Sequence, residues 1–222
     1  NNYYGKASGL LDQIGVAFGN VVQIDFKDIS NPKVNPIEFP FDGLSFVGVN
    51  TGGDHSSMNA LYSKIPMDMK SAAKKMGVEY LRESSLEELK KVETLTDAEY
   101  NRSFHYYTEN ERVLKAIDAL KNKNISEFLK QMNESRFSST NYLKNMMVEG
   151  CYEGSPLEAC DIVMSILNEE GACKINGGGF AGSIICAVPK HLLRKFVHIM
   201  KKEYGKENVV LINIRKFGPR SF

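Results

Sequence analysis

The sequence predicts an α+β fold in which helices cover a small antiparallel sheet. The first observation is a set of three short apolar runs near the carboxyl end, at Cys173–Asn176, Ser183–Val188 and Val209–Ile214. The second is the helical spacing of apolar residues in the segments before and between these runs. The third is a glycine segment, Asn176–Gly182, that lies between the first two runs. The sequence contains no internal repeat.

Composition describes an ordinary globular chain. It has 222 residues, 42% hydrophobic and 25% charged, with a net charge of +1, which suits one large domain or two small ones. No basic field suggests nucleic acid, no apolar run approaches the roughly 20 residues of a membrane span, and nothing resembles a secretory leader. The four cysteines are too far apart for a C-x-x-C motif, so we expect buried thiols in a cytoplasmic protein: Cys151, Cys160, Cys173 and Cys186.

The amino-terminal part of the chain predicts one short helix followed by two strands. Ser8 is expected to cap the helix and Gly19 to end it. Strands are expected at Val21–Phe26 and Ser45–Asn50. Between them, Asp28–Pro40 carries three prolines and is expected to form a loop or a weak edge segment.

The middle of the chain predicts helices, because three pairs of residues have the spacing of a capping box. These are Ser85 with Glu88, Thr96 with Glu99, and Thr108 with Glu111, so three helix starts are expected. The helical segments expected after them are Thr108–Leu120 with Val113, Ile117 and Leu120 on one face, Ser126–Met147, Ser155–Leu167, and Pro189–Tyr204.

The three consecutive glycines after Asn176 have no side chain to bury, which indicates a backbone that needs an unusual conformation or a close approach. A dinucleotide fingerprint would require a helix to open at Gly182, but a strand is expected there. Two readings remain. The segment is either a hairpin turn that only reverses the chain, or a loop whose N–H groups face an anion or a neighbouring phosphate loop, and we favour the loop.

Asp12 is the acidic residue best placed for chemistry. It lies off the apolar stripe of Leu10 and Ile14, near the start of its helix, where a carboxylate is stabilised in its ionised form. It could accept a proton from a substrate hydroxyl, or it could be a solvated acid that favours the helix start. Tyr62 has a ring suited to stacking on a sugar. The alternative is that it is simply a tyrosine of the hydrophobic core, which the sequence does not distinguish. The histidines have no partner at metal-ligand spacing, so no metal-ligating residue is predicted.

Five segments share the order and approximate spacing of one known family. They are Gly5–Gln13, Asn50–Ser56 with Tyr62 beyond it, Tyr107–Leu114, Met132–Ser135 and Gly177–Gly182. Together they resemble the GHMP small-molecule kinases, and within them the galactokinase branch, over nearly the whole chain. Gly177–Gly182 is similar to the last signature motif of that family.

The resemblance implies roles for particular residues. Asp12 matches the catalytic aspartate that takes or positions the anomeric hydroxyl of the sugar, and Gly9 matches a backbone position near the sugar. Tyr62 matches a tyrosine that packs against it. The loop beside the phosphate-binding loop is matched by Gly177, Gly178, Gly179, Phe180 and Gly182. The chain departs from the family pattern at Asn176, Ala181 and Asp54, where threonine, glycine and a basic residue are usual.

The activity implied by the resemblance is transfer of the γ-phosphate of ATP, with Mg²⁺, to the anomeric hydroxyl of galactose. The family's Gly-Glu-His sugar motif and its Gly/Ser phosphate motif are not in these 222 residues, so the chain corresponds to a carboxy-terminal portion that we expect to be inactive alone. Residues 1–45 would be a remnant of the amino-terminal domain with the catalytic-aspartate helix, and residues 46–222 the carboxy-terminal domain with the glycine loop.

Two other functions are compatible with the same residues. One is a non-catalytic sugar-binding or regulatory protein on the same fold, because a fold does not fix a function. The other is a GHMP kinase for an amino sugar or another small alcohol. In each case the expected partners are small molecules, with neither nucleic acid nor membrane, and the sequence does not indicate an oligomeric state.

Overall fold

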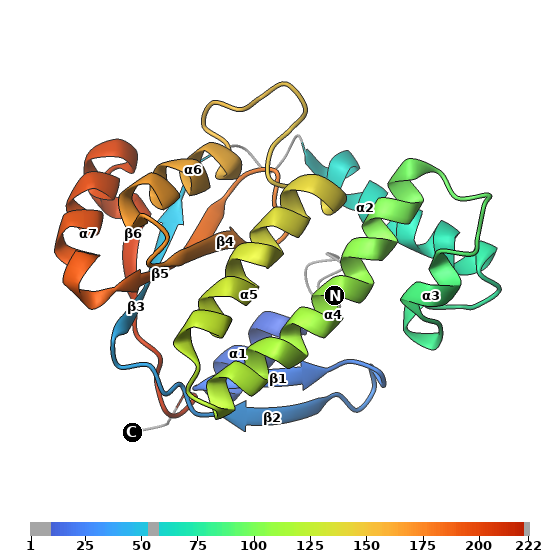
Figure 1. Cartoon of the computed structure of the whole chain (residues 1–222), viewed down its shortest axis with the longest axis horizontal. Coiled ribbons are helices and arrows are strands. Elements are labelled where there is room, and N and C mark those ends of the chain that lie inside the picture. Colours follow the sequence, from blue (N-terminus) through green and yellow to red (C-terminus); the bar gives the residue numbers. More distant parts are fainter. Residues whose placement is uncertain (1–9, 53–57, 220–222) are drawn as a thin grey trace.

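A computed structural model describes residues 10–52 and 58–219 (Figure 1). The predicted α+β class is confirmed: helices pack around a small antiparallel sheet, and a separate hairpin lies beside it. In chain order the elements are α1 (Leu11–Phe18), β1 (Val21–Asp25), β2 (Lys33–Ile37), β3 (Leu44–Asn50), α2 (Asn59–Lys75), α3 (Leu86–Leu89), α4 (Asp97–Lys121), α5 (Ile125–Ser138), α6 (Pro156–Leu167), β4 (Ala172–Asn176), β5 (Ser183–Pro189), α7 (Lys190–Tyr204) and β6 (Val209–Ile212).

The main sheet has four antiparallel strands in the order β4–β5–β3–β6. Side chains alternate between its two faces, as the pleat requires. Cys173 pairs with Cys186 on one face, where α6 and α7 complete the main core. Ala172 pairs with Ala187 on the other face, against which α5 packs. These strands therefore carry apolar side chains on both faces, because helices cover both faces of the sheet.

The β1–β2 hairpin forms its own two-stranded sheet, with α1 leading directly into β1. The expected weak edge segment is therefore a real strand, in which Pro36 pairs with Val22. An aromatic cluster joins the hairpin to the main sheet, with ring centroids 5.2 Å apart for Phe39 and Phe46, and 5.9 Å apart for Phe39 and Phe128. Packing of these rings fixes the hairpin against α5.

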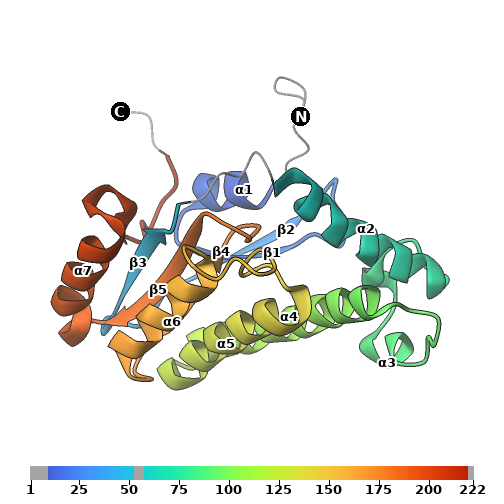
Figure 2. The same ribbon diagram turned by 90° about the horizontal axis from the view of Figure 1, so that it is seen from above.

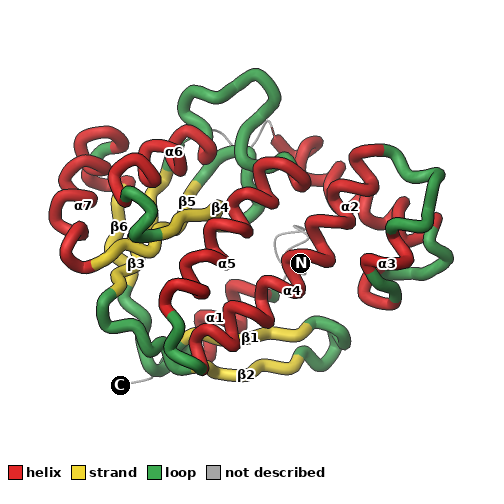
Figure 3. Tube along the Cα trace, in the orientation of Figure 1, coloured by secondary structure: helices red, strands yellow, loops and turns green. Residues whose placement is uncertain are grey.

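Helices α4 and α5 run side by side (Figure 2). The capping box of α4 is complete, because Thr96 and Glu99 each bind the backbone N–H of the other. The third predicted helix start, at Thr108, is wrong: α4 continues unbroken past it (Figure 3). The Thr108 hydroxyl donates to the carbonyl of Phe104, one turn earlier, so this threonine bonds within a helix and does not begin one.

Four further expectations are corrected by the structure. Helix α1 begins at Leu11 and has no side-chain cap, while Ser8 lies outside the described residues. The segment expected at Ser126–Met147 begins one residue earlier, because the side chain of Asn124 accepts from the N–H of Glu127, and it ends with a π-helical turn at Leu143. Val113 is 49% exposed, because it lines an open cavity between α4 and the turn that joins β1 to β2, and Cys151 is exposed in the loop before α6. The remaining predicted helices and strands are present.

Among the described helices, none combines the length and the apolar character that a membrane span needs. The division into residues 1–45 and 46–222 stays a prediction.

Glu99 offers a test of how α2 and α4 are held together. Its buried carboxylate accepts from Lys75 and Ser71 of α2 and from the Thr96 N–H. The hydrogen bond from Lys75 contributes most to lowering the Glu99 pKa to about 2, from 4.5. We expect Glu99→Gln to lower the free energy of unfolding by about 2 kcal/mol at pH 7, because charge-assisted bonds are lost.

Because the pKa of the folded state is depressed, this contribution is present above pH 4.5 and is lost as the pH falls towards 2. Urea unfolding at several pH values measures it. Glu88→Gln is the control, since Glu88 pairs with Lys91 in an exposed bridge, and removing it should cost no more than about 0.5 kcal/mol. A Glu99→Gln deficit that is equal at pH 7 and pH 2.5 would refute this assignment.

Candidate functional site

The glycine loop, residues 177–182, connects β4 to β5, so a strand follows it as predicted and the dinucleotide reading fails. Its backbone is left-handed at four positions: φ is +98° at Gly177, +92° at Gly179, +60° at Phe180 and +91° at Gly182. Glycine adopts these angles without the steric penalty of a Cβ atom. Phe180 bears that penalty, and its buried side chain packs edge-on against the Tyr62 ring, with centroids 5.5 Å apart.

The three consecutive glycines are required for different reasons. At Gly177 a Cβ would meet open space, so only the backbone angle calls for glycine. At Gly178 a Cβ would lie 2.6 Å from the Tyr62 ring. At Gly179 it would overlap the backbone carbonyl and the side-chain amide of Asn145. The backbone of this segment therefore lies very close to Tyr62 and Asn145. The sequence analysis predicted such a close approach but named neither neighbour.

The far end of the loop is tied to the end of β3. The carbonyl of Gly182 accepts from the N–H of Thr51 at 2.7 Å and from its hydroxyl at 2.8 Å, and the Gly182 N–H donates to the carbonyl of Gly52 at 3.0 Å. Polar side chains at the neighbouring strand ends continue this edge: Asn176 donates from its amide to the hydroxyl of Ser183 at 3.2 Å. The strand ends and the loop together line a shallow cavity of about 480 Å³.

The N–H groups of Gly177, Gly178 and Gly179 have no acceptor among the described residues, and all three glycines line this cavity. Consecutive bare N–H groups in a turn attract anions. No group of three or more histidine, cysteine, aspartate or glutamate side chains in the described ranges could hold a metal ion. The chemistry that this edge offers is therefore hydrogen bonding to an anionic group.

Tyr62 is brought to the glycine loop, where its hydroxyl donates to the carbonyl of Gly179 at 2.6 Å. Asp12 lies exposed in the first turn of α1. In the described ranges its side chain makes no hydrogen bond or ion pair, and it does not line the cavity of the glycine loop. Gly9, Asp54 and His55 lie outside the described residues. Tyr62 is thus the predicted site residue that the structure places against the loop.

Asn145 is a residue that sequence reasoning missed. It is 3% exposed and follows a π-helical turn at Ser139–Leu143 that continues α5. Its backbone carbonyl accepts from the N–H of Phe180 at 2.5 Å, and its side-chain amide donates to the carbonyl of Gly178 at 3.0 Å. No motif marks it, because a lone asparagine after a helix most often ends that helix or begins a turn.

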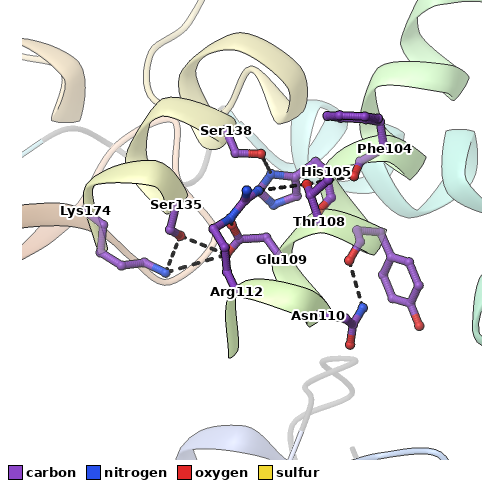
Figure 4. A network of polar contacts seen from close by, with 10 residues as sticks. Phe104, His105, Thr108, Glu109, Asn110, Arg112, Ser135, Ser138 and Lys174 are labelled. Carbon is purple, nitrogen blue, oxygen red and sulfur yellow. Dashed lines mark hydrogen bonds and ion pairs between the residues drawn. The ribbon is translucent and has the colours of Figure 1, made fainter. Parts of the chain in front are cut away.

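A partly buried polar network, residues Glu109, Arg112, Ser135 and Lys174, holds β4 to the α4–α5 pair (Figure 4). The hydroxyl of Ser135 accepts from Lys174 at 2.6 Å and donates to Glu109 at 2.8 Å. Arg112 donates to the other oxygen of Glu109 at 2.5 Å. Lys174 lies in β4, three residues before the glycine loop begins at Gly177, so this network anchors the strand that leads into the loop.

Burial and charge oppose each other in this network. Burial raises the pKa of Glu109, but Lys174 and Arg112 outweigh it, and the net pKa of Glu109 is lowered. Burial lowers the pKa of Lys174 despite the attraction of Glu109. Beside them, His105 lies 2.9 Å from the hydroxyl of Ser138, and burial lowers its pKa to about 4, so its ring is neutral at pH 7. The network is therefore a structural anchor with one buried neutral histidine at its edge.

Comparison with known proteins identifies the relatives of this chain. It is 26% identical over 211 residues to the galactokinase of Actinobacillus pleuropneumoniae serotype 3, a match that covers 93% of the chain. The chain is galactokinase-like. The galactokinase-like chain spans about half the length of the curated relatives it matches, 53% in this case. No protein-family model matches it.

Solved structures show the same fold. A galactokinase of Lactococcus lactis, solved in complex with galactose, superposes with a TM-score of 0.78 at 21% identity, over 98% of this chain and 57% of that one. The mevalonate kinase of L. major, solved in complex with R-mevalonate, follows with a TM-score of 0.57 at 15% identity, over 94% of this chain and 53% of that one. The fold expected from the sequence resemblance is thereby confirmed, and the curated relatives support the resemblance itself.

Alanine substitutions in the loop of the galactokinase-like chain separate backbone strain from close contact. Gly177→Ala should lower the free energy of unfolding by about 1 kcal/mol, the usual cost of a Cβ at positive φ. Gly179→Ala should cost roughly 3 kcal/mol, because overlap with Asn145 adds to that strain. Denaturant unfolding of both variants measures the difference. Equal losses would mean that Asn145 does not touch the loop.

The galactokinase-like chain should also lose stability on mild acidification because of His105. Its pKa in the folded state, about 4, lies below the ordinary value of 6.5, so the unfolded chain binds a proton first as the pH falls. Below pH 6.5 the free energy of unfolding should fall by up to about 1.4 kcal/mol per pH unit relative to His105→Gln. Urea titrations of both proteins between pH 7 and 5 test this. Parallel pH dependences would contradict a buried neutral ring.

Proposed function

We propose that the chain is the carboxy-terminal portion of a galactokinase-type sugar kinase, which transfers the γ-phosphate of ATP to the anomeric hydroxyl of galactose. The observation that carries this proposal is the similarity to curated galactokinases over 93% of the chain. The galactose bound to the Lactococcus lactis relative supports the choice of sugar. Residues 1–45 would belong to the amino-terminal domain of the complete enzyme and residues 46–222 to its carboxy-terminal domain.

Asp12 would act on the sugar hydroxyl. Its exposed carboxylate in the first turn of α1 is open to a ligand and would accept the proton of the sugar hydroxyl. A general base in this position contributes roughly 10²- to 10⁴-fold to a rate. Gly9 would lie near the sugar in the same segment, and Tyr62 would pack against the sugar beside the glycine loop.

The glycine loop would lie next to the phosphates. MgATP, when bound, supplies the phosphoryl group and the metal charge that phosphoryl transfer needs. The residues of this chain fit such a group, since the N–H groups of Gly177, Gly178 and Gly179 are free among the described residues and line a polar cavity.

Catalysis of phosphoryl transfer is mostly positioning and charge stabilisation, so a chain without the family's Gly/Ser phosphate motif should not turn over. We expect no ATP-dependent formation of galactose 1-phosphate by the 222-residue chain alone. We expect activity when it is joined to the part of the Actinobacillus pleuropneumoniae galactokinase that its match leaves uncovered. This second protein is called the joined protein below.

In the joined protein, Asp12→Asn should lower kcat by roughly 10²- to 10⁴-fold, because the proton acceptor is lost. Asp118→Asn is the matched control: Asp118 is an exposed aspartate on α4, and its loss should change kcat less than twofold. A coupled assay for galactose 1-phosphate measures both. Turnover by the 222-residue chain alone would refute the view that the missing motifs are essential. An Asp12→Asn variant that behaves like Asp118→Asn would overturn the catalytic role of Asp12.

A further inference from the structure

We propose that Asn145 is the positioning residue of the glycine loop: it sets the direction of the loop amides that meet the nucleotide phosphates. This inference rests on the proposed kinase function for the identity of the ligand, and on the structure alone for the geometry. Asn145 comes from the segment after α5, more than thirty residues before the loop, so the chain must fold to bring the two together.

Asn145 binds two successive peptide groups of the loop. Its side-chain Nδ2 donates to the carbonyl of Gly178 at 3.0 Å, and its own carbonyl accepts from the N–H of Phe180 at 2.5 Å. The absence of a side chain at Gly179, between them, is what allows this approach. Asn145 therefore binds only backbone atoms of the loop, and its two hydrogen bonds do not depend on the side chains at other loop positions. These two hydrogen bonds are called the clamp below.

The clamp determines where the free N–H of Gly179 points. A trans peptide is planar, with its C=O and N–H on opposite sides. Because the Gly178 carbonyl faces Asn145, the N–H of Gly179 in the same peptide group is turned away from Asn145. That N–H has no acceptor among the described residues, and Gly179 lines the cavity. Asn145 thus sets the orientation of the peptide group between Gly178 and Gly179, and with it the direction of the Gly179 N–H.

Asn145 is itself held rigidly. The preceding residue, Lys144, adopts a left-handed conformation that ends the π-helical turn, and the N–H of Asn145 donates to the carbonyl of Ser139 at 3.3 Å. The following residue, Met146, is buried in the main core, and its carbonyl accepts from the N–H of Leu157 at 3.0 Å. A loop held by such a residue loses little freedom when it binds a ligand.

Tyr62 holds the same loop from the α2 side. Its hydroxyl donates to the carbonyl of Gly179 at 2.6 Å, a carbonyl that also accepts from the N–H of Ala181 at 2.8 Å. The carbonyls of Gly178 and Gly179 and the N–H of Phe180 therefore all have hydrogen-bond partners within the protein. Among the described residues, the N–H groups of Gly177, Gly178 and Gly179 have no acceptor, and consecutive N–H groups of this kind can bind an anion.

The chain offers a matched control in Asn133 of α5. Its Nδ2 donates to the carbonyl of Gly171 at 3.1 Å, just before β4, and its Oδ1 is buried without a partner among the described residues. The Oδ1 of Asn145 is in the same state. Asn133 and Asn145 thus make equivalent side-chain bonds to opposite ends of the β4–β5 hairpin, and only Asn145 touches the glycine loop.

The first test is NMR relaxation of backbone amides in the 222-residue chain. In the wild type we expect order parameters near 0.85 at Gly178, Gly179 and Phe180, as in rigid backbone, and we expect Asn145→Ala to lower them to about 0.6. Asn133→Ala should leave them unchanged. Asn145→Asp is a second variant of the same size, in which an oxygen replaces Nδ2 and repels the Gly178 carbonyl, so it should loosen the loop as well.

A loop that stays rigid in both Asn145 variants would overturn the proposal, as would equal loosening by Asn133→Ala. The second test measures KM in the joined protein. Asn145→Ala should raise the KM for ATP at least tenfold and leave the KM for galactose within twofold, a split that general destabilisation would not give. Equal changes in both constants would also overturn the proposal. A wild-type joined protein without activity would contradict the proposed function, while the relaxation result would still decide the role of Asn145.

Discussion

The site depends on one close approach: the backbone of the glycine loop lies directly against Asn145. Asn145 donates one hydrogen bond and accepts another, and these hold the peptide groups on either side of Gly179, while the Tyr62 hydroxyl donates to the Gly179 carbonyl in the second of these groups. Any side chain at Gly179 would separate these groups. Three segments far apart in the sequence therefore meet only because this loop has no side chains where they touch, and the free N–H groups of the loop follow from that contact.

The rest of the fold places the partners of this contact. The core under α6 and α7 includes Met146, so it fixes the segment that carries Asn145. The polar network around Glu109 fixes β4 through Lys174, and with it the start of the loop. Charged groups are costly to bury, and this network tolerates them because each carboxylate oxygen has a donor. Strand β4 is therefore held on one face by the apolar core, through Cys173 and Ile175, and on the other face by the polar network, through Lys174.

The sequence predicted five of the six described strands, most helices and the glycine loop, because each depends on local spacing; β2 was expected only as a loop or a weak edge segment. The capping box at Thr96 is confirmed, whereas an identical spacing at Thr108 lies inside a helix, because a capping motif states a preference that a continuous helix can override. Asn145 could not be found this way: its partners are more than thirty residues distant, and its role comes from tertiary contact. The catalytic role of Asp12 and the sugar contact of Tyr62 stay predictions, carried by resemblance to the GHMP kinases.

The central claim is tested most directly by the scalar coupling that passes through a hydrogen bond. In the isotope-labelled 222-residue chain, NMR can measure this coupling between the amide nitrogen of Phe180 and the carbonyl carbon of Asn145. The structure places these groups 2.5 Å apart between nitrogen and oxygen, so a clear coupling between these two residues is expected. Its absence, in a chain whose β4–β5 ladder shows the couplings of a formed sheet, would contradict the clamp on the glycine loop.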